Sequence, residues 1–302
     1  MNMIHTSVLL RESVDGLNIR DGDIYLDGTL GSAGHAFYAL EKCKNITIIG
    51  LDRDKEALDR SKDRLEEYSR QNSSRIILKE SNYADMAKVL DELSIPKINR
   101  IMLDLGLSSD QFETSGRGFS FRKDEPLLMT FKKDIQGGDL TAWIIVNKWE
   151  ENNIADIIYG YGEERYARRI ARSIVNYRQK KNIDTTAELV EIINSSVPYF
   201  YRHGRLHSAT RTFQALRIAV NDELNSLKCG LSKGFERLEK KGRIAVISFH
   251  SLEDRIVKNF NKEKSDIGEA LIITNKPITP TDKEIQDNPR SRSAKLRILE
   301  KI

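Results

Sequence analysis

Short apolar runs alternate with amphipathic stretches over the first hundred residues of the chain. Runs rich in isoleucine, leucine and valine lie at residues 24–26, 46–51, 75–78, 100–105 and, much later, 243–249. Runs that are apolar on both faces are typical of buried parallel strands. Between the first four runs, residues 55–68 and 83–93 carry apolar side chains at helical spacing. This alternation predicts an α/β fold with a doubly wound, mostly parallel sheet.

The alternation stops after residue 105, where polar loops and helical patterns follow for about a hundred residues. The clearest helix there is ERYARRIARSIVNYRQK, residues 164–180, with Ile170, Ile174 and Tyr177 on one face and arginines on the other. We therefore predict an inserted helical domain. The expected division is a first part of the α/β domain at residues 1–110, the insertion at 111–210 and a second part at 211–302.

The C-terminal third predicts the rest of the α/β domain. Apolar positions from Thr212 to Leu227 follow helical spacing, and residues 231–240 predict a further helix before the strand at 243–249. The segments ALIITNKP and AKLRILEKI predict two more strands, which we expect to form an antiparallel hairpin at the sheet edge. The predicted sheet then has seven strands.

Composition and cysteine usage restrict the class of protein. The chain has 302 residues, 39% hydrophobic and 31% charged, as in folded globular proteins rather than disordered ones. Its apolar runs fall far short of the ~20 residues that cross a membrane, and the N-terminus has no secretory pattern. Cys43 and Cys229 are too few and too distant for a metal motif or a disulfide framework. We expect a cytoplasmic protein with no metal site and no membrane partner.

The distribution of charge along the chain is more informative about binding partners than the net charge of +4. Residues 165–181 contain seven basic residues and no acidic one, and residues 202–217 contain four arginines and two histidines, again without an acid. Such local excess is expected where a protein contacts phosphates. A solvated basic helix face is the alternative interpretation, and the sequence leaves it open.

The stretch IYLDGTLGSAGHAFYAL, residues 24–40, joins a predicted strand to a predicted helix through small residues. Its glycines are spaced G-x-x-G-x-x-G rather than the G-x-G-x-x-G of dinucleotide sites, which speaks against an NAD-dependent dehydrogenase. A helix N-terminus after such a loop favours a carboxylate, which S-adenosylmethionine carries. Asp52, at the end of the next strand, could accept hydrogen bonds from ribose hydroxyls. Asp104 ends the fourth strand. The alternative interpretation is structural: the glycines only form the turn, and the aspartates only cap helices.

Sequence blocks spread from residue 5 to residue 297 carry a resemblance to a known family. They read HTSVLL, DGTLGSAGH, LDRD, LDLGLSSDQ, RGFSF, YGEERYARRIARSIV, ATRTFQALRIAVNDEL, ISFHSLEDRIVK and NPRSRSAKLR. The chain resembles the MraW-type family, ribosomal RNA small subunit methyltransferase H. The resemblance implies a class I S-adenosylmethionine-dependent methyltransferase domain interrupted by a helical substrate domain. It also implies methylation of the N4 amine of a cytidine in the decoding region of small-subunit (16S) ribosomal RNA.

The resemblance also implies a set of cofactor-binding positions: Ala33, Gly34, His35, Asp52, Tyr83, Asp104 and Gln111. The chain departs from the family pattern in two places. Ala33 replaces a glycine, which costs about 1 kcal/mol if the position needs a positive φ. The family segment P-L-D-M-R-M-D reads PLLMTFK here, with Leu128, Thr130 and Lys132 in place of three charged residues. The exact target is therefore open, and a diverged paralogue with another RNA target is an alternative.

The chemistry of methyl transfer to an amine suggests the remaining candidates. The amine needs an acceptor for one of its N–H groups, for which Asp104, Ser108 and Ser109 are the candidates. Phe119 and Phe121, in RGFSF with Arg117, could stack on the base. Candidate RNA contacts are Arg117, Arg211, Arg217, Arg290, Arg292 and His250. His250 directly precedes Ser251–Asp254, which also fits a capping box, so a structural role there is equally open.

Three functions are compatible with the sequence. The first is an RNA N4-cytidine methyltransferase acting on the small ribosomal subunit, with S-adenosylmethionine as cofactor. The second is an NAD-dependent dehydrogenase, which the glycine spacing disfavours. The third is a ribosome-assembly binding module that kept the fold and lost methylation. A homodimer is compatible with the sequence, which does not fix the oligomeric state.

Overall fold

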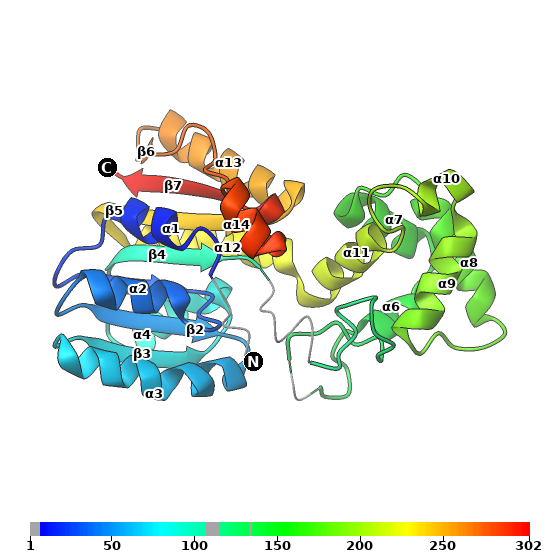
Figure 1. The fold of residues 1–302 in the computed structure, drawn as a ribbon, viewed down its shortest axis with the longest axis horizontal. Helices are drawn as coiled ribbons and strands as arrows, with labels where there is room; N and C mark the ends of the chain where they lie inside the picture. Colours follow the sequence, from blue (N-terminus) through cyan, green and yellow to red (C-terminus); the bar gives the residue numbers. More distant parts are fainter. Residues whose placement is uncertain (1–6, 107–114, 133–134) are drawn as a thin grey trace. The chain divides into compact units, whose positions relative to one another are not determined.

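A computed structural model describes residues 7–106, 115–132 and 135–302 (Figure 1). The chain forms two compact units, one made of Met1–Gly106 with Leu224–Ile302 and the other of Leu107–Glu223. The predicted boundaries lay at residues 110 and 210. In the described part of the chain, no helix combines the length and the apolar character that crossing a bilayer requires.

The first unit is built on a seven-stranded sheet. Its strands are β1 (Ile24–Asp27), β2 (Thr47–Asp52), β3 (Arg75–Glu80), β4 (Ile98–Asp104), β5 (Leu238–Ser248), β6 (Ala270–Ile272) and β7 (Lys295–Lys301). They lie in the order β3-β2-β1-β4-β5-β7-β6. Strands β1 to β5 are parallel, whereas β7 runs antiparallel to both β5 and β6. The predicted fold class, a mostly parallel sheet with an antiparallel C-terminal pair, is confirmed.

Helices cover both faces of this sheet. They are α1 (Leu10–Leu17), α2 (Gly34–Lys42), α3 (Lys55–Gln71), the 3-10 turn η1 (Tyr83–Asp85), α4 (Met86–Glu92), α12 (Glu223–Arg237), α13 (Ser251–Asp266), α14 (Asp282–Asp287) and the 3-10 turn η2 (Pro289–Ser293). Successive strand residues face opposite sides, so Ile48 joins the core under α1, α2 and α3, while Ile49 joins the core under α4, α12 and α13. Burial on both faces explains why the strands read as continuous apolar runs.

The second unit is helical. It contains α6 (Ala142–Lys148), α7 (Glu151–Gly162), α8 (Ala167–Arg178), α9 (Thr186–Ser196), α10 (Tyr199–Arg202) and α11 (Thr210–Asn221). These helices enclose a core of their own, to which Ile145, Ile158, Ile170 and Leu216 contribute. A Cβ on Gly162 would lie 2.6 Å from the carbonyl oxygen of Arg211, so glycine is what allows α7 to pack this closely on α11.

Two predictions in the C-terminal third were wrong in detail. The helical pattern from Thr212 to Leu227 belongs to two helices, because Asp222 adopts a left-handed conformation with φ of 49° and ends α11. The helix predicted at 231–240 is the second half of α12, which ends at Arg237, and β5 starts at Leu238 rather than near residue 243. The apolar pattern continues across both breaks, so periodicity could not reveal them.

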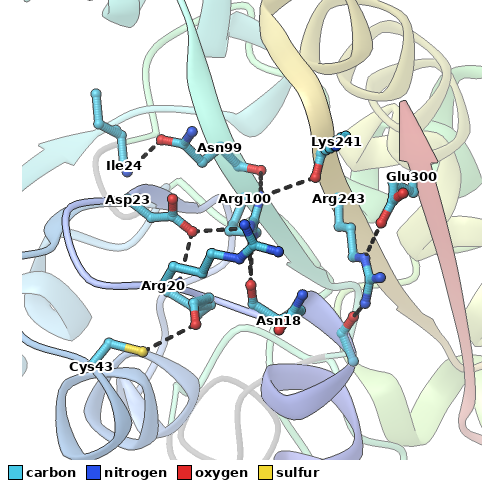
Figure 2. A network of polar contacts seen from close by, with 12 residues as sticks. Asn18, Arg20, Asp23, Ile24, Cys43, Asn99, Arg100, Lys241, Arg243 and Glu300 are labelled. Atoms are coloured by element: carbon cyan, nitrogen blue, oxygen red, sulfur yellow. Dashed lines mark hydrogen bonds and ion pairs between the residues drawn. The ribbon is translucent and has the colours of Figure 1, made fainter. Parts of the chain in front are cut away.

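A polar network joins several strands at the amino edge of the sheet (Figure 2). Arg100 of β4 is only 5% exposed, and its guanidinium pairs with Asp23 at 3.1 Å. It also donates to the carbonyl oxygens of Asn18, Asn99 and Lys241. The network thereby ties the segment before β1 to β4 and β5 at the edge opposite the carboxyl ends of the parallel strands.

Candidate active site at the carboxyl edge of the sheet

Four neighbouring parallel strands each end in an acidic residue. In spatial order these are Glu80 of β3, Asp52 of β2, Asp27 of β1 and Asp104 of β4. Parallel strands bring their carboxyl ends to one edge, the usual ligand-binding edge of such sheets. The fold therefore places Asp52 and Asp104, the two acids singled out in the sequence, along the same edge of the first unit as Asp27.

Asp27 is the most enclosed of these acids, with 1% of its surface exposed. Its carboxylate accepts hydrogen bonds from the Thr29 backbone N–H at 3.2 Å and from the Tyr25 hydroxyl at 3.3 Å. Burial, and secondarily the nearby charges of Asp104 and Asp52, raise the pKa of Asp27 to about 7. The pKa of Tyr25 is raised well above its usual value, first by burial and then by Asp27, so its hydroxyl is a neutral donor.

Asp104 is connected to the loop after β1. Its backbone N–H donates to the Thr29 hydroxyl at 2.6 Å, and its carboxylate accepts from the Gly106 N–H at 3.4 Å. Burial, with a smaller contribution from the Glu253 carboxylate, raises the pKa of Asp104 to about 7. Sequence reasoning missed Thr29 and Tyr25. A signal was available, because both polar side chains lie within two residues of the strand-end aspartate.

The three glycines of the loop are explained largely by packing within the protein. A Cβ on Gly28 would lie 2.5 Å from the Leu103 side chain, and one on Gly34 would lie 2.0 Å from the Ser7 hydroxyl oxygen. Gly31 has a φ of 51°, in the left-handed region that glycine favours. The glycine spacing therefore reflects the turn itself, and it is not by itself a sign of a ligand.

Ala33 has the positive φ on which the cost of replacing the family glycine depends. It is fully buried, with φ of 61° and ψ of 23°, and forms the N-cap of α2. A left-handed backbone costs a residue with a Cβ about 1–2 kcal/mol. Alanine also offers no side-chain acceptor to the first-turn N–H groups of α2, which are the groups that a carboxylate would use.

Asp52 holds the loop to the end of β2. Its carboxylate accepts the Gly31 N–H at 2.8 Å through one oxygen and the Asp54 N–H at 2.9 Å through the other. Burial raises its pKa, and these hydrogen bonds oppose the rise. The Arg53 N–H also bonds to this carboxylate, which has about four acceptor sites, so ribose binding by Asp52 stays a prediction that the remaining capacity allows.

The other predicted cofactor positions lie around this edge with partners of their own. The buried His35 ring places Nε2 3.2 Å from the Val8 carbonyl oxygen. Tyr83 packs against α12, where a Cβ on Gly230 would lie 2.6 Å from the tyrosine ring. Contact of either side chain with a cofactor stays a prediction. Three further candidates, Ser108, Ser109 and Gln111, lie outside the described residues.

The aromatic candidates for base stacking lie in the helical unit. Phe119 is 5% exposed and stacks on Phe131 with 5.5 Å between ring centroids. Phe121 is partly buried and stacks on the His207 ring at 4.5 Å. Arg117 donates to the Phe131 carbonyl oxygen at 2.8 Å. Burial of the Phe119 ring favours a structural role over base stacking, because its faces are covered by protein.

The candidate arginines differ in how far protein groups already engage them. Arg211 donates to the carbonyl oxygen of Glu163, and Arg217 forms two hydrogen bonds of 2.8 Å with the Glu223 carboxylate. Arg290 and Arg292 are exposed in η2. This turn leads into β7, whose Lys295 pairs with Ser248 at the end of β5. Arg290 and Arg292 thus lie in the first unit near its carboxyl edge, and RNA contact by any of the four arginines stays a prediction.

His250 caps a helix. Its Nδ1 accepts the Glu253 N–H at 3.4 Å, and the Glu253 carboxylate accepts the backbone N–H of His250. The capping box therefore starts at His250, one residue earlier than the sequence suggested, with Glu253 rather than Asp254 as its acid. A role in RNA binding stays a prediction beside this structural one.

The divergent segment 126–132 belongs to the core and rim of the helical unit. Thr130 is 4% exposed, and its hydroxyl accepts the Lys132 N–H at 3.2 Å. The Lys132 ammonium group pairs with Asp139 at 2.6 Å. Thr130 and Lys132 therefore fit a folded segment, and the effect of the three changes on the target stays open.

Comparisons with known proteins identify the family of this chain. The sequence profile of the MraW methylase family matches residues 2–302. A protein from Sulfurihydrogenibium sp. (strain YO3AOP1) named ribosomal RNA small subunit methyltransferase H is 46% identical over 298 residues, covering 99% of each chain. A protein of the same name from Synechococcus elongatus is 47% identical, covering 99% of this chain and 95% of the relative. The chain described here belongs to the MraW methylase family.

Proposed function

We propose that the protein transfers a methyl group from S-adenosylmethionine to the N4 amine of a cytidine in small-subunit ribosomal RNA. The observation that supports this most is the row of Asp27, Asp52 and Asp104 along one sheet edge, next to a loop and helix N-terminus, in a chain of the MraW methylase family. Relatives 46% and 47% identical carry the name of a small-subunit ribosomal RNA methyltransferase.

The residues at this edge fit the proposed cofactor chemically. Asp27 and Asp104 are enclosed carboxyls, and a cationic ligand offsets the cost of ionising such groups in a buried place. Asp52 retains acceptor capacity for ribose hydroxyls, and the α2 N-terminus after Ala33 suits a carboxylate. When bound, S-adenosylmethionine supplies an electrophilic methyl group on a positively charged sulfur.

The protein's own contribution is positioning and the handling of one proton. The N4 lone pair of cytosine is delocalised into the ring, so an acceptor for an N–H hydrogen favours the attacking geometry. Asp104 ends β4 at this edge, and its N–H bond to Thr29 fixes the backbone there at 2.6 Å. An ionised Asp104 carboxylate, which a cationic cofactor favours, can accept a hydrogen bond from the amine and hold the departing proton. We assign this role to Asp104, with Ser108 and Ser109 as further candidate partners of the amine.

Two alternatives use the same observations. A diverged paralogue with another RNA target would account for Leu128, Thr130 and Lys132 in the divergent segment. A ribosome-assembly module without activity would keep the fold and the RNA contacts and lose catalysis. Both predict unmethylated N4 at the expected cytidine.

Two measurements separate these functions. Isothermal titration calorimetry of the purified protein should show heat of binding with S-adenosylmethionine and none with NADH. Mass spectrometry of nucleosides from small-subunit ribosomal RNA should show N4-methylated cytidine only in cells that contain the protein. Methylation at a different nucleoside supports the paralogue, and the absence of any protein-dependent methylation supports the binding module.

A further inference from the structure

A group of aromatic and arginine side chains outside the site described above gathers in the helical unit, where α10 lies against the start of α8 (Figure 1). Tyr199 and Phe200 on α10 are 74% and 65% exposed, unusually open for large aromatic side chains. The Arg165 guanidinium lies 5.9 Å from the Phe200 ring centroid. We call Arg165, Tyr199, Phe200, Arg202 and Arg205 the α10 surface.

The base of the α10 surface is held firmly by buried groups. Glu164 is fully buried and accepts a hydrogen bond from the Tyr201 hydroxyl and another, at 2.8 Å, from the Tyr166 N–H. The Tyr166 and Tyr201 rings meet edge to face at 4.9 Å. Arg165 lies over both rings, 4.9 Å from Tyr166 and 5.0 Å from Tyr201. These contacts pre-organise the surface, which lowers the entropic cost of binding a ligand.

The chain segment that carries α10 has charged residues of one sign. Arg165, Arg202 and Arg205 are exposed, and no acidic residue occurs between Val197 and Asn221. Just before α8, Glu164 is buried, whereas Glu163 is exposed and its backbone carbonyl oxygen accepts from Arg211. Proteins hold unpaired nucleotides with two components, exposed aromatic rings that stack on the bases and arginines that contact the phosphates. The α10 surface has both.

We propose that the α10 surface binds a single-stranded segment of RNA, with bases stacked on Tyr199 and Phe200 and phosphates contacted by Arg165, Arg202 and Arg205. The inference rests on the proposed function, since it takes the substrate to be RNA, and it adds an anchoring surface separate from the acidic sheet edge. Such an anchor reads unpaired RNA through stacking, and therefore prefers single strands to duplexes.

The test is fluorescence anisotropy of the full-length protein with a labelled, unstructured pyrimidine RNA, without S-adenosylmethionine. The double variant Tyr199→Ala/Phe200→Ala should weaken binding about ten-fold or more, as expected when stacked aromatics are removed. The pair Arg202→Ala/Arg205→Ala should also reduce the salt dependence of binding, by about one in logarithmic slope for each arginine that neutralises a phosphate.

Tyr159→Ala is the matched control, because Tyr159 is 69% exposed on α7 and has Asp156 and Glu163 at helical spacing. It should leave RNA affinity unchanged. Unchanged affinity in the Tyr199/Phe200 variant, an equal loss with Tyr159→Ala, or stronger competition by duplex than by single-stranded RNA would each overturn the proposal. If the Tyr199/Phe200 variant loses the wild-type protein's binding to phosphatidylglycerol vesicles but still binds RNA normally, the α10 surface binds a membrane instead.

Failure of this inference can be told apart from failure of the proposed function. If wild-type protein methylates ribosomal RNA while the Tyr199/Phe200 variant binds single strands normally, the inference fails and the function stands. If no methylated cytidine depends on the protein but the variant loses RNA affinity, the function fails and the RNA surface stands. Equal melting temperatures of variant and wild type show that the fold is intact.

Discussion

At the residue scale, the structure explains the glycines of the loop after β1 by packing and backbone conformation, without a bound ligand. Gly28 and Gly34 are small because Leu103 and Ser7 occupy the adjacent space, and Gly31 supplies a positive φ. The sequence could predict that Asp52 and Asp104 each end a strand, and the structure adds Asp27 at the end of the strand between them. The sequence could not predict that Tyr25 and Thr29 fix two of these acids, because hydrogen bonds depend on side-chain placement that no periodicity records.

Replacing Ala33 with glycine should stabilise the protein. Relief of a left-handed backbone is worth about 1–2 kcal/mol, and the greater flexibility of unfolded glycine offsets about half of that. We expect a gain of roughly 1 kcal/mol in the free energy of unfolding, measured by urea denaturation. A loss of stability would show that the buried methyl group contributes more than the backbone strain costs.

The pKa of Asp27 predicts how stability changes with pH. The pKa is about 7 in the folded protein against an ordinary 3.8. Between these values the folded state binds more protons than the unfolded state, so the free energy of unfolding falls as pH rises from about 4 to 7. Asp27→Asn cannot ionise and keeps an acceptor for the Thr29 N–H. We expect it to gain on the order of 2–4 kcal/mol at pH 8 relative to wild type.

Urea denaturation at pH 5 and pH 8 measures this difference. Asp59→Asn, on the exposed side of α3, is the control and should follow the wild type at both values of pH. The account of Asp27 is contradicted if Asp27→Asn and wild type lose the same stability between pH 5 and pH 8.

At the element scale, strands were easier to predict than helix ends. All seven strands are visible as short apolar runs. In β2, β4 and β7 burial on both faces explains this, whereas β3 and β6, at the two edges of the sheet, are only partly buried. The break between α11 and α12 depends on one residue, Asp222, in a left-handed conformation, and the apolar spacing on either side gives no sign of it. The α10 helix, only Tyr199–Arg202, was likewise too short to show a period.

The network around Arg100 shows how elements far apart in the sequence are held together (Figure 2). Arg100→Met leaves the Asp23 carboxylate and three carbonyl oxygens without their buried donor. Breaking such a buried pair costs about 3–5 kcal/mol. We expect a loss of that size in the free energy of unfolding, and a smaller loss for Arg243→Met, whose side chain is 19% exposed.

A double variant tests the cause of that loss. Asp23→Asn in the Arg100→Met background removes the unpaired charge, so it should recover part of the stability. Additive losses in the two variants would mean that the ion pair is not the source of the stabilisation.

At the scale of the whole molecule, the sequence predicted two units and the class of the first. The observed division at residues 106 and 223 assigns α11 to the helical unit, because Phe213 and Leu216 join the helical core. The family match identifies the chain as a member of the MraW methylase family. The N4 target, the role of Asp104 in accepting the amine proton and the RNA contacts of the arginines are proposals. Those depend on how RNA lies on the protein, which neither strand order nor core packing determines.

The most direct test of the central claim is the nucleoside composition of small-subunit ribosomal RNA from cells that lack the protein and receive it back. The wild-type protein should restore N4-methylated cytidine, detected by mass spectrometry. Asp104→Ala should not restore it, although circular dichroism shows the variant folded. Near-normal methylation by Asp104→Ala would contradict the role of Asp104, and no methylated cytidine with the wild-type protein would contradict the proposed function itself.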